Sequence, residues 1–127
     1  DLFHVGHVNI LRNAKALCDK LVVCVTVDEL VKYKGKNPVI SFVERIEVVR
    51  ACQYVDLAIP QMSIDKVETI KKIKANILVV GDDWYSHERW KDMEDELSKI
   101  SCKVVYFPYT KGVSSTLINQ TLESIRT

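Results

Sequence analysis

The 127-residue chain is long enough for one domain with its own core, and 47% of its residues are hydrophobic. A net charge of +1 gives no basis for a nucleic-acid partner, and no apolar run approaches the roughly 20 residues of a membrane span. The four cysteines form no CxxC pair and stand among apolar neighbours, which predicts reduced core thiols and a cytoplasmic location. We therefore expect one domain over residues 1–127, with neither a nucleic-acid nor a membrane partner.

Strand-like and helix-like stretches alternate along the chain. In chain order the expected elements are a helix over 7–17, a strand over 21–27, a helix from the capping box Ser41–Glu44 to about 52, a strand over 57–60, a helix marked by Val67, Ile70 and Ile73, a strand over 77–80, a helix over 87–97, a strand over 103–107, and a last helix after Ser115. Trp90 is expected in the core.

This alternation predicts a single Rossmann-like α/β fold, a doubly wound parallel sheet of about five strands in the order 3-2-1-4-5 with helices on both faces. In such a fold the first strand is central to the sheet. The sequence opens directly at what looks like the turn after that strand. We therefore expect a further strand upstream of Asp1.

The motif His4-Val5-Gly6-His7 stands at the start of the first expected helix. Gly6 lets the backbone approach a phosphate closely, and a helix N-terminus offers N–H groups and a positive dipole end. The imidazoles of His4 and His7 can donate hydrogen bonds to phosphate oxygens as charge develops on them. The motif predicts phosphoryl-type transfer chemistry, against the alternative of two incidental loop histidines.

An acidic turn, Gly81-Asp82-Asp83-Trp84, follows the expected strand over 77–80. Ligands of open α/β sheets bind beyond the carboxyl ends of the strands. Carboxylates there can accept from a sugar hydroxyl or a base amino group, and the indole can stack on a base. A solvated turn at a strand end is the alternative interpretation.

A segment rich in glycine and hydroxyl groups, Thr110 to Thr116, lies before the last expected helix. Such a segment at a helix start is a second cradle for anions. An ordinary serine N-cap after a glycine turn is the alternative. The candidates are Thr110, Gly112, Ser114, Ser115 and Thr116.

Basic side chains lie in and after the loop over 32–40. Lys34 and Lys36 are placed to close over a triphosphate, unless they belong to a solvated surface loop. Arg45 and Arg50 follow in the next helix about 140° apart, so at most one is well aimed at a given ligand. Asp28 ends a strand, where it either serves the site or caps the next helix.

Taken together and in order, these motifs resemble the cytidylyltransferase family. The matching stretches are Asp1–His7, Val25–Glu29, Tyr54–Asp56, Gly81–Trp84 and Gly112–Thr116. The likeness is strongest to the bacterial glycerol-3-phosphate cytidylyltransferases of teichoic acid synthesis, and it covers nearly the whole chain.

The resemblance implies transfer of CMP from CTP to a phosphorylated alcohol such as glycerol 3-phosphate, with Mg²⁺ accompanying CTP. His4 and His7 would stabilise the α- and β-phosphates, and Lys34 and Lys36 would contact the triphosphate and the substrate. The remaining implied nucleotide contacts are Gly6, Asp28, Gly81, Asp82, Asp83, Trp84 and the 110–116 candidates. Lys36, Arg45 and Arg50 are the acceptor-binding candidates. The family also implies a homodimer and no protein metal ligands.

Two positions depart from the family pattern, because Tyr109 and Gln53 stand where basic residues are usual. A lost guanidinium removes a bidentate phosphate contact. The acceptor therefore stays open among phosphorylated alcohols and sugars. The alternatives are an adenylyltransferase of the same fold and a non-catalytic nucleotide-binding protein.

Overall fold

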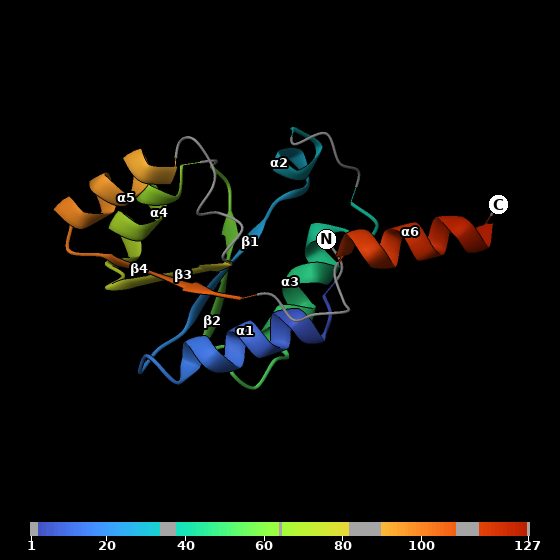
Figure 1. Ribbon diagram of the computed structural model, residues 1–127, viewed down its shortest axis with the longest axis horizontal. Helices are drawn as coiled ribbons and strands as arrows, with labels where there is room; N and C mark the ends of the chain where they lie inside the picture. The colour runs from blue at the N-terminus through green and yellow to red at the C-terminus, as the bar shows by residue number, and fades with distance from the viewer. Residues whose placement is uncertain (1–2, 34–37, 64, 82–89, 109–114, 127) are drawn as a thin grey trace. The chain divides into compact units, whose positions relative to one another are not determined.

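The computed structural model describes residues 3–33, 38–63, 65–81, 90–108 and 115–126. These residues form six helices and four strands that alternate along the chain. In order the elements are α1 (Val5–Lys15), β1 (Val22–Thr26), α2 (Asp28–Tyr33), α3 (Phe42–Arg50), β2 (Leu57–Gln61), α4 (Lys66–Ile73), β3 (Ile77–Gly81), α5 (Trp90–Lys99), β4 (Lys103–Phe107) and α6 (Ser115–Arg126) (Figure 1).

The strands pair in parallel, as the alternation with helices predicts. β1 pairs with β2 from Val22↔Leu57 to Thr26↔Gln61. β3 pairs with β4 from Ile77↔Lys103 to Gly81↔Phe107. These are the two outer pairs of the expected order 3-2-1-4-5. The described residues thus contain four of the expected five strands, as two separate two-stranded sheets.

The chain divides into two compact units, residues 1–62 with 110–127 and residues 63–109. The first unit has a core of Val25, Ile46, Val49 and Ala58, against which Phe3, Val23, Phe42 and Val55 pack. The second has a core of Val67, Ile70, Leu97 and Cys102. Each core joins one strand pair to the helices beside it, so each unit buries its own apolar face.

Three expectations need correction. The short helix α2 was not predicted from the sequence. Its six residues are too few for the spacing of apolar residues to show a helical period. The capping box at Ser41 does not form, since α3 begins at Phe42 with no capping hydrogen bond from the Ser41 side chain. None of the four cysteines forms a disulfide, but only Cys102 is buried, while Cys18 and Cys52 are partly buried and Cys24 is exposed, so the expectation of core thiols holds for Cys102 alone.

The other local predictions agree closely with the structure. All four expected strands are present within one residue at each end. Trp90 is 2% exposed, as expected for a core residue. Among the described residues, no helix is long and apolar enough to cross a membrane.

Candidate functional site

The two histidines of the first motif cap α1 through their own side chains. His4 is the N-cap residue, and its Nδ1 accepts the backbone N–H of Gly6 at 3.0 Å. His7 occupies the third helical position, and its Nδ1 accepts the backbone N–H of His4 at 3.2 Å. The rings lie 4.1 Å apart between centroids. This is the reciprocal arrangement of a capping box, with imidazoles in place of a hydroxyl and a carboxylate.

These hydrogen bonds determine which ring nitrogen carries the proton. A nitrogen that accepts a backbone N–H holds no proton, so each neutral imidazole carries its proton on Nε2. Burial, and then the neighbouring His4, lower the pKa of His7 from 6.5 to about 4. Burial also lowers the pKa of His4. Both rings are therefore neutral at pH 7, and each has one N–H donor to offer.

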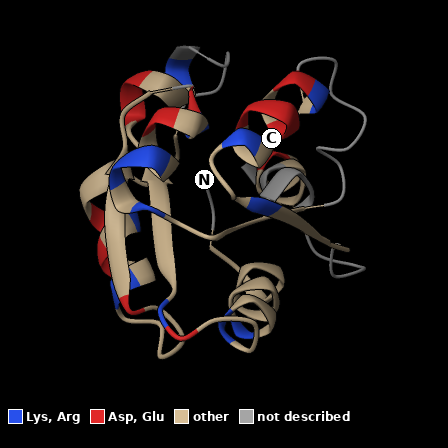
Figure 2. Ribbon diagram, turned by 90° about the vertical axis from the view of Figure 1, so that its left-hand side faces the viewer, with Lys and Arg blue, Asp and Glu red and all other residues tan. Residues whose placement is uncertain are grey.

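The start of α1 also differs from most other helix starts in charge. Four of the six described helices carry an acidic residue in the first turn, namely α2, α3, α4 and α5. α1 and α6 carry none. Figure 2 shows the contrast between α1, which has no acidic residue, and α5, which has several. The first turns of α1 and α6 thus supply no carboxylate of their own to offset the positive dipole end, which favours an anion.

The direction of α1 relative to β1 follows from contacts at its far end. Lys15, in the last turn of α1, forms an ion pair with Asp56 at 2.6 Å, and Asp56 also accepts the N–H of Leu21 just before β1. The C-terminal end of α1 therefore lies at the amino end of β1. Ligands of α/β sheets bind at the opposite, carboxyl end of the strands.

Asp28 and Arg45 lie at that same carboxyl end. Asp28 follows β1 and begins α2, and its carboxylate accepts a hydrogen bond from Arg45 at 2.7 Å. The same carboxylate accepts the backbone N–H of Phe42, the first residue of α3, at 3.1 and 3.2 Å to its two oxygens. These hydrogen bonds lower the pKa of Asp28, that from Arg45 contributing most. Asp28 thus begins α2 but caps α3, the next helix along the chain.

Comparison with known proteins shows the family to which this chain belongs. The family model described as "Cytidylyltransferase-like" matches residues 1–121. The chain belongs to the cytidylyltransferase-like family.

Relatives of this cytidylyltransferase-like chain carry the names of different biosynthetic proteins. It is 32% identical to the glycerol-3-phosphate cytidylyltransferase of Staphylococcus aureus (strain NCTC 8325 / PS 47), over 96% of this chain and 88% of that one. It is 37% identical to the FAD synthase of Archaeoglobus fulgidus, over 83% of this chain and 76% of the other. The crystal structure of a lipopolysaccharide core biosynthesis protein from Thermoplasma volcanium is similar at a TM-score of 0.71 and 26% identity, covering 89% of this chain and 91% of that one.

Several predicted site residues of the cytidylyltransferase-like chain have described positions. Gly6 is buried in the first turn of α1, and Gly81 is the last residue of β3. Arg50 lies on α3 and pairs with Glu47 at 2.8 Å, with about half of its side chain exposed (52%). Ser115 and Thr116 begin α6.

Other predictions fall outside the described residues. These are Lys34, Lys36, Asp82, Asp83, Trp84, Thr110, Gly112 and Ser114. Their roles stay predictions.

The two departures from the family pattern lie in different places. Gln53 is exposed and stands between α3 and β2, close to Asp56 at the amino end of β1. Tyr109 lies outside the described residues.

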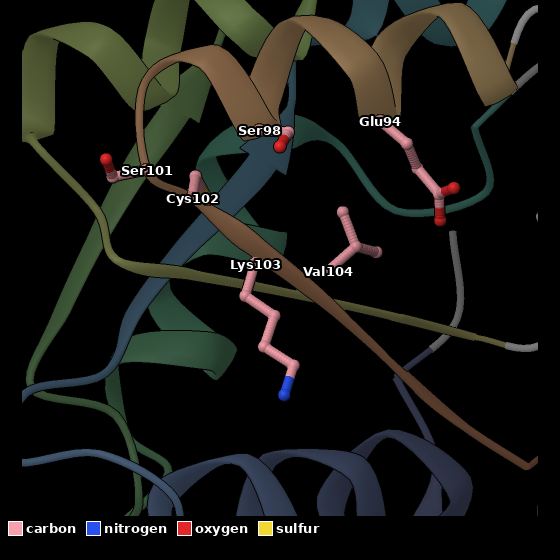
Figure 3. A pocket seen from close by; sticks show the side chains of 6 residues that line it. All are labelled: Glu94, Ser98, Ser101, Cys102, Lys103 and Val104. Carbon is pink, nitrogen blue, oxygen red and sulfur yellow. The ribbon is translucent and has the colours of Figure 1, made fainter.

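A hollow in the second unit holds none of the predicted site residues. It has a volume of about 370 Å³ and is lined by residues of α5, β4 and the turn between them (Figure 3). Glu94 and Ser98 project into it from α5, and the Glu94 carboxylate accepts the hydroxyl of Tyr106. Tyr106 in turn accepts the indole N–H of Trp90. These polar groups satisfy one another beside the core, which indicates a structural role for this network.

Proposed function

We propose that this protein transfers CMP from CTP to a phosphorylated alcohol, with glycerol 3-phosphate as the leading acceptor. The observation that carries the proposal is the start of α1, where two neutral imidazoles each keep an Nε2–H donor. No carboxylate in the first turn of this helix competes for an anion. The similarity to glycerol-3-phosphate cytidylyltransferases supports the choice of nucleotide and acceptor.

In this reaction a phosphate oxygen of the acceptor attacks the α-phosphorus of CTP. The bond from that phosphorus to the bridging oxygen breaks in line, and pyrophosphate leaves. Charge grows on the α-phosphoryl oxygens and on the leaving group. His4 and His7 would donate their Nε2–H groups to these oxygens, and because the rings are already held by the backbone, no reorientation is needed as the charge develops.

Other predicted residues enter the proposal by resemblance. Lys34 and Lys36 would neutralise the triphosphate, while Ser115 and Thr116 would hold phosphates at the start of α6. The acidic turn that follows Gly81 would form part of the nucleotide pocket. A homodimer and a cytoplasmic location also belong to the proposal.

Mg²⁺ is the expected companion of CTP. This ion commonly keeps several waters and binds substrate phosphates, so it does not need an all-protein ligand cluster. In the described ranges no group of three or more His, Cys, Asp and Glu side chains is placed to hold a metal. When bound, Mg²⁺ would neutralise part of the triphosphate charge through the oxygens of the nucleotide itself.

Adenylyl transfer is the second candidate. The FAD synthase of Archaeoglobus fulgidus is 37% identical to this chain over 83% of its length, against 32% over 96% for the glycerol-3-phosphate cytidylyltransferase of Staphylococcus aureus. The chemistry at the α-phosphorus would be the same, with ATP in place of CTP and a flavin phosphate as the acceptor.

The test is pyrophosphate release from CTP and from ATP, with Mg²⁺, against glycerol 3-phosphate, other phosphorylated alcohols and sugars, and FMN. We expect release with CTP and one phosphorylated alcohol. Release only with ATP and FMN would replace the proposal by its second candidate. CTP binding without release for any acceptor would favour a non-catalytic nucleotide-binding protein.

A further inference from the structure

Resting on the proposed function, we infer that Asp28 and Arg45 act together as positioning residues for the transfer step. They hold the start of α3 against the end of β1. Through the core of the first unit, they thereby hold the imidazole of His7 in place. This role differs from the separate ligand contacts that resemblance suggests for the two residues.

The Asp28 carboxylate joins two consecutive helices, α2 and α3, across 14 residues of chain. Its residue begins α2, while its oxygens receive the first N–H of α3 from Phe42 and a hydrogen bond from Arg45. The side chain of Ser41, the N-cap residue of α3, makes no capping hydrogen bond in the described structure, and the Asp28 carboxylate accepts the first N–H of the helix instead. A charged acceptor at a helix N-terminus is also favoured by the helix dipole. The orientation of α3 therefore depends on Asp28.

The Arg45 guanidinium is held on two sides. Its Nε donates to the backbone carbonyl of Ile40 at 3.0 Å, and its terminal nitrogen donates to Asp28 at 2.7 Å. Only 10% of its side chain is exposed, against 52% for Arg50 on the same helix. A direct contact with an acceptor would require Arg45 to break hydrogen bonds that it already makes. Its geometry suits a residue that acts through Asp28 and the α3 start.

A continuous path of contacts leads from α3 to the histidine pair. Phe42 packs against the core formed by Val25, Ile46, Val49 and Ala58, and Phe3 packs against the same core. The Phe3 ring stacks on His7, with centroids 5.4 Å apart and planes 14° from parallel. Close-packed cores transmit small shifts. Loosening α3 is therefore expected to shift Phe3 and, with it, the His7 ring.

The experiment measures kcat, and KM for CTP and for the acceptor, in the full chain carrying Asp28→Asn, Arg45→Met or both changes. Asp56→Asn is the matched control, because Asp56 also accepts one backbone N–H and one cation but lies at the other end of β1. All assays run below the melting temperature of each variant. The ¹⁵N chemical shifts of the His7 ring provide a readout that does not depend on turnover.

We expect each single variant to lose about 10-fold in kcat with little change in either KM, since small misplacements of catalytic groups are costly. The double variant should lose no more than the worse single variant, because the two residues act as one unit. The His7 shifts should move in all three. Asp56→Asn should leave kcat and the His7 shifts unchanged. If Asp28→Asn does not fold, Asp28→Glu and Arg45→Lys carry the same comparison, with smaller losses.

Three results would overturn the inference. One is a raised KM for CTP in Asp28→Asn alone and for the acceptor in Arg45→Met alone, with additive effects, which would make them separate ligand contacts. Another is a lowered melting temperature with kcat and His7 shifts unchanged. The third is an equal loss of kcat in Asp56→Asn. An inactive wild-type protein would count against the proposed function alone, because the His7 shifts still test the positioning.

Discussion

Asp28 and Asp56 lie at opposite ends of β1 and make the same kinds of contact. Each accepts a backbone N–H from a distant element and pairs with one cation, Arg45 for Asp28 and Lys15 for Asp56. At the amino end the pair ties α1 and β2 to the start of the strand. At the carboxyl end Asp28 accepts the N–H of Phe42, which packs against the same core as Phe3, and the Phe3 ring stacks on His7. Identical local chemistry thus serves stability at one end and, by our inference, the reaction at the other.

The largest effect on turnover is expected from substitutions at the start of α1. His4→Ala or His7→Ala should lower turnover by about 100-fold or more, because each removes an Nε2–H donor to the developing charge. Lys15→Met, at the other end of the same helix, should leave turnover unchanged. Steady-state CMP transfer with circular dichroism as a folding check measures both. Near-normal turnover in both histidine variants would remove them from the mechanism.

The next largest expected effect is a difference in the pH dependence of stability between His7 and the aspartates at the ends of β1. The pKa of His7 is about 4 in the folded protein and near the ordinary 6.5 when unfolded. Between these values the unfolded chain binds a proton that the folded protein does not, so stability present above pH 6.5 falls as the pH drops toward 4.

The aspartates respond in a lower range of pH. Hydrogen bonds from Leu21 and then Lys15 lower the pKa of Asp56 below its ordinary 3.8, so its contribution is lost only as the pH falls further. Thermal melts from pH 7 to pH 3 of the wild type and of His7→Asn, which cannot titrate, test this. Parallel curves for the two proteins between pH 6.5 and 4 would contradict the shift assigned to His7.

A smaller effect is expected from Asp56→Asn. Loss of the ion pair with Lys15 and weakening of the hydrogen bond from Leu21 should lower the melting temperature by roughly 3–6 °C. Turnover below that temperature should not change. Lys15→Met should cost less, since Asp56 keeps its hydrogen bond from Leu21. A loss of turnover beyond twofold in Asp56→Asn would remove the contrast between the two ends.

The smallest effect concerns the capping of α3. Ser41→Ala should change the free energy of unfolding by less than about 0.5 kcal/mol, because its side chain caps nothing in the described structure. Asp65→Ala is the matched control, since Asp65 caps α4 by accepting the N–H of Val67 at 3.0 Å and should cost about 1 kcal/mol. Chemical denaturation measures both. If both variants lost the same free energy of unfolding, Ser41 would cap α3 as the sequence predicted.

Local patterns were sufficient to predict most of the helices and strands. The four strands follow from short β-branched runs, and Trp90 was correctly expected in the core. The capping box predicted at Ser41 is wrong because the first N–H of α3 is hydrogen-bonded by the Asp28 carboxylate instead. The helix α2 was missed because it is too short for a period to show.

What the sequence by itself determined is whatever depends on neighbours within about four residues. The strands and helices are of this kind, and so is the His4–His7 pair, whose hydrogen bonds join residues two and three apart. Tertiary structure alone decided the partners of Asp28, 14 and 17 residues away, and of Asp56, 35 and 41 residues away. A carboxylate next to a strand gives no local sign of which distant N–H it will meet, because that depends on how the strands pair and how the helices pack on them.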